Sequence, residues 1–134
     1  MSVFSKMISD EEPLMKRDDN RLTIFPIKHP EIWDMYQKAV STFWVPEEID
    51  FSRDMDDWDA LGENEQFFIK HILAFFSSSD TIVNINIGER FIKEVEILEA
   101  KFFYAFQETI ENIHSHTYSL LIDTYVKDPE ERDK

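Results

Sequence analysis

The sequence contains no cysteine, only 2 glycines among its 134 residues, and no long uninterrupted apolar run. Without cysteine it can form no disulfide, no thiolate metal site and no cysteine nucleophile. So little glycine, and no series of short strand-like segments separated by turns, favours helices over an all-β fold. No stretch of about 20 apolar residues is free of charge, so we expect no transmembrane helix and no membrane association. Met1 to Asp10 also lacks the apolar core of a signal peptide, and we expect a cytoplasmic protein.

Basic residues are scarce as well. The chain has 14 Lys and Arg against 28 Asp and Glu, a formal net charge of −14. No basic patch is visible, so we do not expect a nucleic-acid partner or binding to an anionic membrane surface. An acidic excess is typical of a solvated surface, and it also suits the capture of cations. The 43% of hydrophobic residues, with 12 Phe, indicates a packed globular domain.

The spacing of apolar residues predicts an all-α fold. We expect a flexible amino-terminal arm over residues 1–22 and one helical domain, or part of one, over 23–134. The helices are predicted at about 30–43, from 63–65 to about 80–88, and at about 90–126. The last of these is apolar around much of its circumference, which is typical of a central helix with neighbours on several sides.

A helix-start signal follows the last predicted helix. Asp128-Pro129-Glu130-Glu131 combines a capping residue, a proline suited to the first turn and an acid at the third helical position. Three residues later the sequence stops. We therefore expect these 134 residues to be the amino-terminal part of a longer protein.

Three polar side chains share one side of the last predicted helix. Glu111, His114 and Tyr118 stand at i, i+3 and i+7, within about 60° of one another around a helix. In helical bundles, Glu-x-x-His is the pattern of di-iron and di-manganese carboxylate sites. Asp80 lies on the apolar stripe of the preceding helix and would add a second oxygen donor. Two oxygens and one nitrogen suit iron or manganese.

Each of these residues also has a purely structural interpretation. Glu111 and His114 could simply be hydrogen-bonded in a core, and Asp80 could cap a helix end. Tyr118 could be an oxidisable phenol beside a metal ion, or a core tyrosine such as we expect for Tyr104 and Tyr125. We do not expect the other histidines to be ligands: His29, His71 and His116. The sequence has no second Glu-x-x-His, so the site either holds one metal ion or is completed from beyond residue 134.

Several stretches occur in a familiar order and spacing: Ile24–Ile27, Phe43–Asp50, Ser77–Asn84, Glu94–Ala100 and Glu111–Tyr125. Together they resemble the small subunit of class I ribonucleotide reductase in its eukaryotic-type form. The resemblance covers nearly all of residues 20–134.

The resemblance implies a ferritin-like helical bundle that forms a homodimer and houses an oxygen-activated di-iron centre, with manganese as the alternative metal. It implies that Asp80, Glu111 and His114 are metal ligands and that Tyr118 carries the stable radical. Trp44 matches the tryptophan on the radical-transfer route to the large catalytic subunit. That partner reduces ribonucleoside diphosphates to deoxyribonucleotides.

The resemblance also shows what these residues lack. The remaining ligands, the aspartate partner of Trp44 and the tail that docks the large subunit come from the second half of such proteins. We therefore expect the 134-residue chain to be inactive by itself. Two other hypotheses remain open at this point: a different di-metal bundle, such as an oxidase or an iron-storage protein, and a non-enzymatic helical interaction module.

Overall fold

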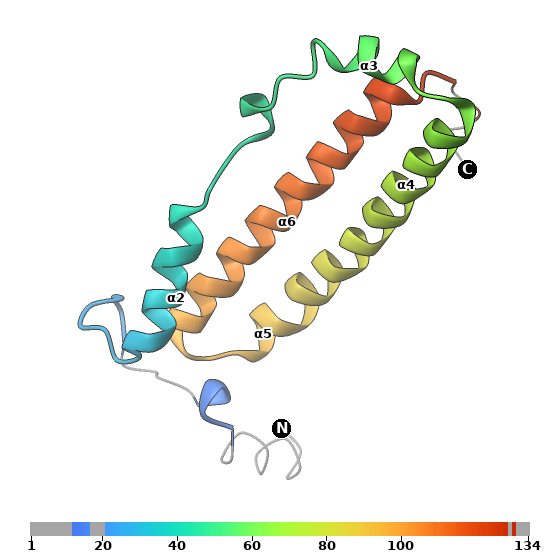
Figure 1. The fold of residues 1–134 in the computed structure, drawn as a ribbon. Helices are drawn as coiled ribbons and strands as arrows, with labels where there is room; N and C mark the ends of the chain where they lie inside the picture. Colours follow the sequence, from blue (N-terminus) through green and yellow to red (C-terminus); the bar gives the residue numbers. More distant parts are fainter. Residues whose placement is uncertain (1–11, 17–20, 129, 131–134) are drawn as a thin grey trace. The chain divides into compact units, whose positions relative to one another are not determined.

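The computed structural model describes residues 12–16, 21–128 and 130, and within these it contains helices and no strand. The all-α prediction is confirmed for this part of the chain. The α-helices (Figure 1) are α2 Pro30–Ser41, α3 Asp54–Ala60, α4 Glu63–Asn86, α5 Ile92–Glu94 and α6 Leu98–Tyr125. Shorter helical turns are η1 Pro13–Met15, η2 Pro46–Glu48 and the π-helical η3 Ile87–Phe91.

Some of our predictions fall outside the described residues. Most of the expected flexible arm does so, and so do two of the four residues of the helix-start signal. Asp128 behaves as a helix-capping residue, because its Oδ1 accepts a hydrogen bond from the amide of Glu130 at 2.9 Å. No helix in the described part of the chain is long and apolar enough to span a membrane.

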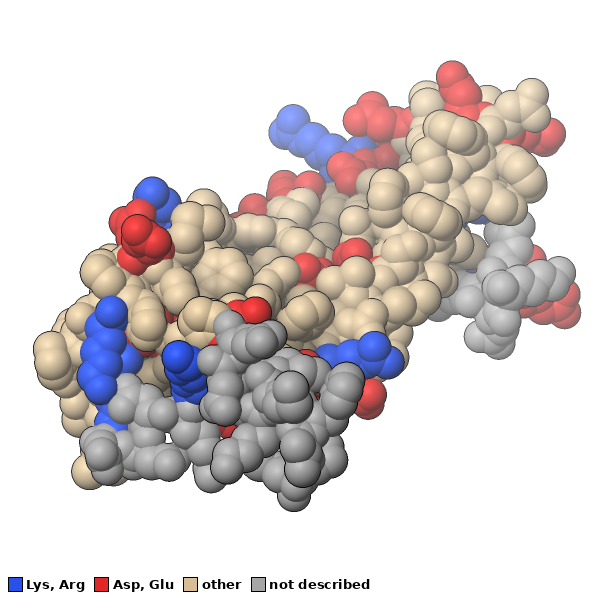
Figure 2. Space-filling model, turned by 90° about the horizontal axis from the view of Figure 1, so that it is seen from below, with Lys and Arg blue, Asp and Glu red and all other residues tan. Residues whose placement is uncertain are grey.

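The chain divides into two compact units. The first is formed by residues 1–43 and 85–110, and the second by residues 44–84 and 111–134. Helices α4 and α6 each contribute residues to both units. Among the described residues on the face that Figure 2 shows, acidic and basic side chains are scattered over broad areas of other residues.

Helix α2 belongs to the first unit and follows its sequence signals. It begins at Pro30, has Glu31 in its first turn and ends at Ser41, two residues before the predicted end. The hydroxyl and the amide of Thr42 both donate to the carbonyl of Ala39, at 2.7 and 3.1 Å, and so close the last turn.

The predicted helix over 90–126 is wrong at its start. The backbone leaves the helical conformation at Val95, and α6 begins at Leu98. The amides of Glu96 and Ile97 donate to the carbonyl of Leu14, at 2.7 and 3.4 Å, instead of to the preceding helical turn. Val95 and Ile97 are buried with Ala100, and Leu14 packs against them. This contact from far along the chain replaces the helical hydrogen bonds.

A buried ion pair holds the loop before α2 against the first turn of α6. The carboxylate of Glu99 is 0% exposed and accepts hydrogen bonds from Nη1 and Nη2 of Arg21, each at 2.6 Å. The amides of Lys28 and His29 also donate to it, at 2.9 and 3.3 Å. Burial opposes the charged form of Glu99, but these hydrogen bonds outweigh it and lower its pKa to about 2.

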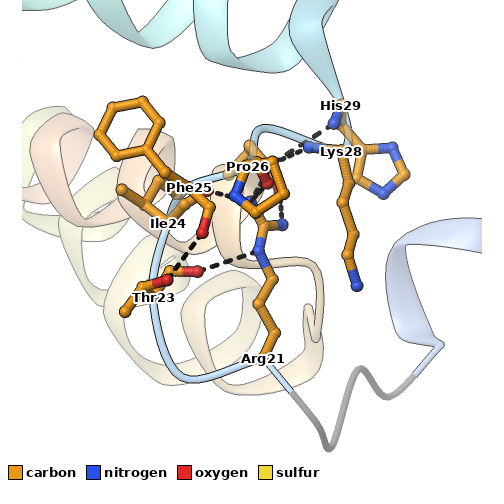
Figure 3. Close-up of polar contacts among 8 residues, drawn as sticks. Arg21, Thr23, Ile24, Phe25, Pro26, Lys28 and His29 are labelled. Carbon is orange, nitrogen blue, oxygen red and sulfur yellow. Dashed lines mark hydrogen bonds and ion pairs between the residues drawn. The ribbon is translucent and has the colours of Figure 1, made fainter.

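The loop itself is folded around the same arginine. Arg21 donates to the carbonyls of Thr23, Ile24 and Pro26, and Figure 3 shows these groups gathered around its guanidinium. A planar guanidinium with five donors can satisfy a carboxylate and several carbonyls at once. Arg21 therefore fixes the segment that leads into α2.

In the second unit, the segment between α2 and α4 also contains helix. Helix η2 follows Val45, and α3 runs over Asp54–Ala60 with Trp58 buried. Acids in the first turn of α3 favour its start through the helix dipole.

Candidate metal centre

Helices α4 and α6 bring together the three residues that we predicted as ligands. Asp80 comes from α4, and Glu111 and His114 come from α6. Each offers one donor atom, and these atoms all lie within 4.8 Å of one another. Nδ1 of His114 lies 3.3 Å from Oε2 of Glu111, as their i, i+3 spacing on one helix allows. All three residues belong to the second unit.

The chemistry of this cluster fits a metal ion. It offers two carboxylates and one imidazole nitrogen, a donor set that suits iron or manganese. The side chains are partly shielded from water, with exposed fractions of 15% for Glu111 and 37% for His114. Among the ion pairs of the described residues, none joins Asp80 or Glu111 to a lysine or arginine. The negative charge collected there is therefore left for a cation to balance.

Tyr118 lies one helical turn beyond His114. Its ring stacks on that of Phe76 from α4, with centroids 6.2 Å apart and planes 16° from parallel. Burial raises the pKa of Tyr118, and the charges of Asp80 and Glu111 raise it further. The phenol is therefore held in its protonated form beside the cluster.

Trp44 lies on the imidazole of His114. The two rings stack with centroids 6.0 Å apart and an interplanar angle of 29°. Trp44 stands just before η2, so a residue outside the long helices reaches the cluster. Stacking of this kind fixes the orientation of the imidazole ring.

The other histidines lie outside the three-residue cluster in the described structure. His116 is exposed on α6. His71 is exposed too, and its Nδ1 lies 2.8 Å from the carbonyl of Phe67.

Sequence reasoning missed a hydrogen bond next to the cluster. Nδ2 of Asn84 donates to Oδ1 of Asn112 at 2.6 Å, which ties α4 to α6. Asn84 is one turn beyond Asp80, and Asn112 directly follows Glu111. Oδ1 of Asn84 is buried and has no partner among the described residues. The sequence held one signal for this hydrogen bond, because both asparagines stand close to predicted ligands along the chain.

Replacing Asn84 by alanine is expected to lower the free energy of unfolding by about 1 kcal/mol, the usual net contribution of such a bond. It should also weaken Mn(II) binding, because Asp80 and Glu111 would be held together less firmly. Urea unfolding and Mn(II) titration of the intact protein measure the two effects. Asn64→Ala, at an exposed position in the first turn of α4, is the matched control. Equal stability and affinity in the two variants would refute a positioning role.

The comparisons with known proteins agree on one family. The family model described as "Ribonucleotide reductase, small chain" matches residues 21–134. Ribonucleoside-diphosphate reductase subunit M2 of Danio rerio is 55% identical over 92% of this chain and 32% of its own length. The human subunit M2 is 54% identical over the same shares. The small chain of Swinepox virus (strain Kasza) is 58% identical over 87% of this chain and 43% of its own.

A solved structure points the same way. The Rnr4 homodimer of Saccharomyces cerevisiae matches with a TM-score of 0.82 and 37% sequence identity, over 96% of this chain and 41% of that chain. This confirms the expected ferritin-like helical bundle as the fold class. The chain spans only about a third to two fifths of the length of the curated relatives it matches. It belongs to the small-chain family of ribonucleotide reductase, in its eukaryotic-type form.

Proposed function

We propose that this chain contributes half of a metal centre to a ribonucleoside-diphosphate reductase small subunit. Asp80, Glu111 and His114 would hold iron, or manganese as the alternative, beside Tyr118. The observation that carries the proposal is the meeting of these three donor atoms within 4.8 Å of one another. Three donors leave coordination positions open, so a complete centre needs ligands from outside these residues.

The residues themselves prepare the site for a cation. Glu111 and His114 are placed by one helix and Asp80 by another, so little rearrangement is needed to bring the donors together. Iron held here would react with oxygen, and the two together would supply the oxidising power to remove one electron from a phenol. Tyr118 is the nearby phenol: it keeps its proton, and its stack on Phe76 fixes the ring.

Trp44 would connect the metal centre to a partner subunit. Its stack on His114 gives a through-ring contact from the cluster to a residue outside the long helices. We propose that this pair begins the route by which the oxidising equivalent reaches a large catalytic subunit, which uses it to convert ribonucleoside diphosphates to deoxyribonucleotides. We also propose a homodimer as the working form, because the yeast relative Rnr4 is a homodimer in its solved structure.

The test is electron paramagnetic resonance of the intact protein after addition of ferrous iron and oxygen. A tyrosyl radical is expected, and Tyr118→Phe should remove its stable signal. Tyr104→Phe should preserve it, because Tyr104 belongs to the first unit, where its ring stacks on Phe91, whereas the three donors belong to the second. A signal of unchanged yield in Tyr118→Phe would contradict the assignment of the radical site.

A further inference from the structure

A second tyrosine of α6 has an arrangement that the metal centre does not use. Oη of Tyr125 donates a hydrogen bond to Oδ2 of Asp54 on α3 at 2.5 Å. The indole of Trp58 stacks on the same phenol ring, with centroids 4.7 Å apart and planes 23° from parallel. Trp58 is only 7% exposed, so it shields one face of the phenol from water. All three residues lie in the second unit.

The hydrogen bond is of the strong, charge-assisted kind. A distance of 2.5 Å is at the short end for a hydroxyl that donates to a carboxylate. Burial raises the pKa of Tyr125, and the hydrogen bond to Asp54 and its negative charge bring it to about 12. The phenol therefore carries its proton at neutral pH, and a base is already in contact with it. Stacking on Trp58 would fasten α3 to α6 equally well with a phenylalanine, so packing alone does not account for the pair.

We propose that Tyr125 is a second one-electron redox site, with Asp54 as its proton acceptor and a radical-type one-electron oxidant as its substrate. In the oxidation, Tyr125 gives one electron to the oxidant, which is thereby reduced by one electron. The O–H bond of the phenol breaks, and its proton forms a new O–H bond on Oδ2 of Asp54. The products are a neutral phenoxyl radical and a neutral carboxylic acid. A one-electron reductant reverses both transfers.

The position of Tyr125 on α6 suits this redox role. It stands seven residues after Tyr118, on the same side of α6 and about 10 Å further along the helix axis. Among the described tyrosines, only Tyr125 has a hydroxyl that donates a hydrogen bond to a carboxylate. Its oxidation therefore has a ready destination for the proton. Tyr125 is suited to receive an electron hole that reaches this end of the helix, and this role requires no metal ion.

Flash oxidation of the metal-free intact protein tests the proposal. Ruthenium(III) tris-bipyridine, generated by a light pulse, is the oxidant, and the phenoxyl absorption is followed in time. In a Tyr118→Phe background we expect a rapid phenoxyl phase, which Tyr125→Phe removes. Asp54→Asn should slow this phase by about a hundredfold, the low end of what a positioned base contributes to a proton transfer.

Two features keep this test decisive. Both substitutions preserve shape, and thermal unfolding with near-ultraviolet circular dichroism verifies that the fold and the aromatic packing persist. Tyr36→Phe, whose ring lies against Trp33 and Phe102 in the first unit, is the control and should leave the rapid phase intact. A rapid phase that persists in Tyr125→Phe, or an unchanged rate in Asp54→Asn, would overturn the proposal. Because no metal is present, neither outcome bears on the function proposed for Tyr118.

Discussion

Replacing His114 by alanine is expected to lower the affinity of the intact protein for Mn(II) or Fe(II) by at least about a hundredfold. Losing a ligand should cost more than losing a hydrogen-bond partner of a ligand, which already weakens metal binding by about 10- to 100-fold. The substitution would leave Asp80 and Glu111 without their nitrogen donor. Titration calorimetry measures the loss of affinity. The electron paramagnetic resonance signal of free Mn(II) provides an independent measurement.

His116→Ala is the matched control for this experiment. It removes a histidine from the same helix only two residues away, but from an exposed position outside the cluster. Its affinity should equal that of the unaltered protein. If both alanine variants bind as tightly as the original, the ions are held elsewhere and the assignment of His114 is wrong.

The second large effect concerns folding. Arg21→Ala is expected to lower the free energy of unfolding by about 3–5 kcal/mol, because it leaves an unpaired buried carboxylate. Glu99 would keep the amides of Lys28 and His29 but lose both guanidinium hydrogen bonds. Lys38→Ala breaks the exposed pair with Asp34, whose side chains are 70% and 59% exposed, and should cost less than about 1 kcal/mol. Urea unfolding compares the two variants, and equal losses would contradict a structural role for the buried pair.

The same pair predicts a dependence on pH. The pKa of Glu99 is lowered from an ordinary value of 4.5 to about 2. Its contribution to stability is therefore complete above the ordinary value and is lost as the pH falls toward 2. The free energy of unfolding, measured from neutral to strongly acidic pH, should decline over this window. The decline should be smaller in Arg21→Ala than in the unaltered protein. An identical decline in both proteins would assign the acid sensitivity to other groups.

The parts of the fold that follow a local rule could be predicted from the sequence. The prediction placed the end of α2 to within two residues, and α4 begins at Glu63, inside the predicted start over 63–65. Glu111 and His114 had to be neighbours once they were on one helix, because the helical repeat fixes that distance. Asp80 was found because a charged side chain interrupts an apolar stripe.

The other features of the fold depend on contacts between residues far apart in the chain, which leave no repeating pattern in the sequence. The helix breaks after Glu94 because a carbonyl at Leu14 takes the amides of Glu96 and Ile97. The bond from Tyr125 to Asp54 likewise joins residues far apart along the chain. Hydrophobic spacing and capping signals describe only near neighbours, so neither pairing could be anticipated.

Anomalous X-ray diffraction from crystals of the intact protein grown with iron or manganese tests the metal centre most directly. Data collected on either side of the metal's absorption edge locate the ion without reference to any sequence. We predict a peak within bonding distance of Asp80, Glu111 and His114, and its loss from that position in the His114→Ala variant. A metal peak bound to other side chains, with these three unligated, would contradict the assignment.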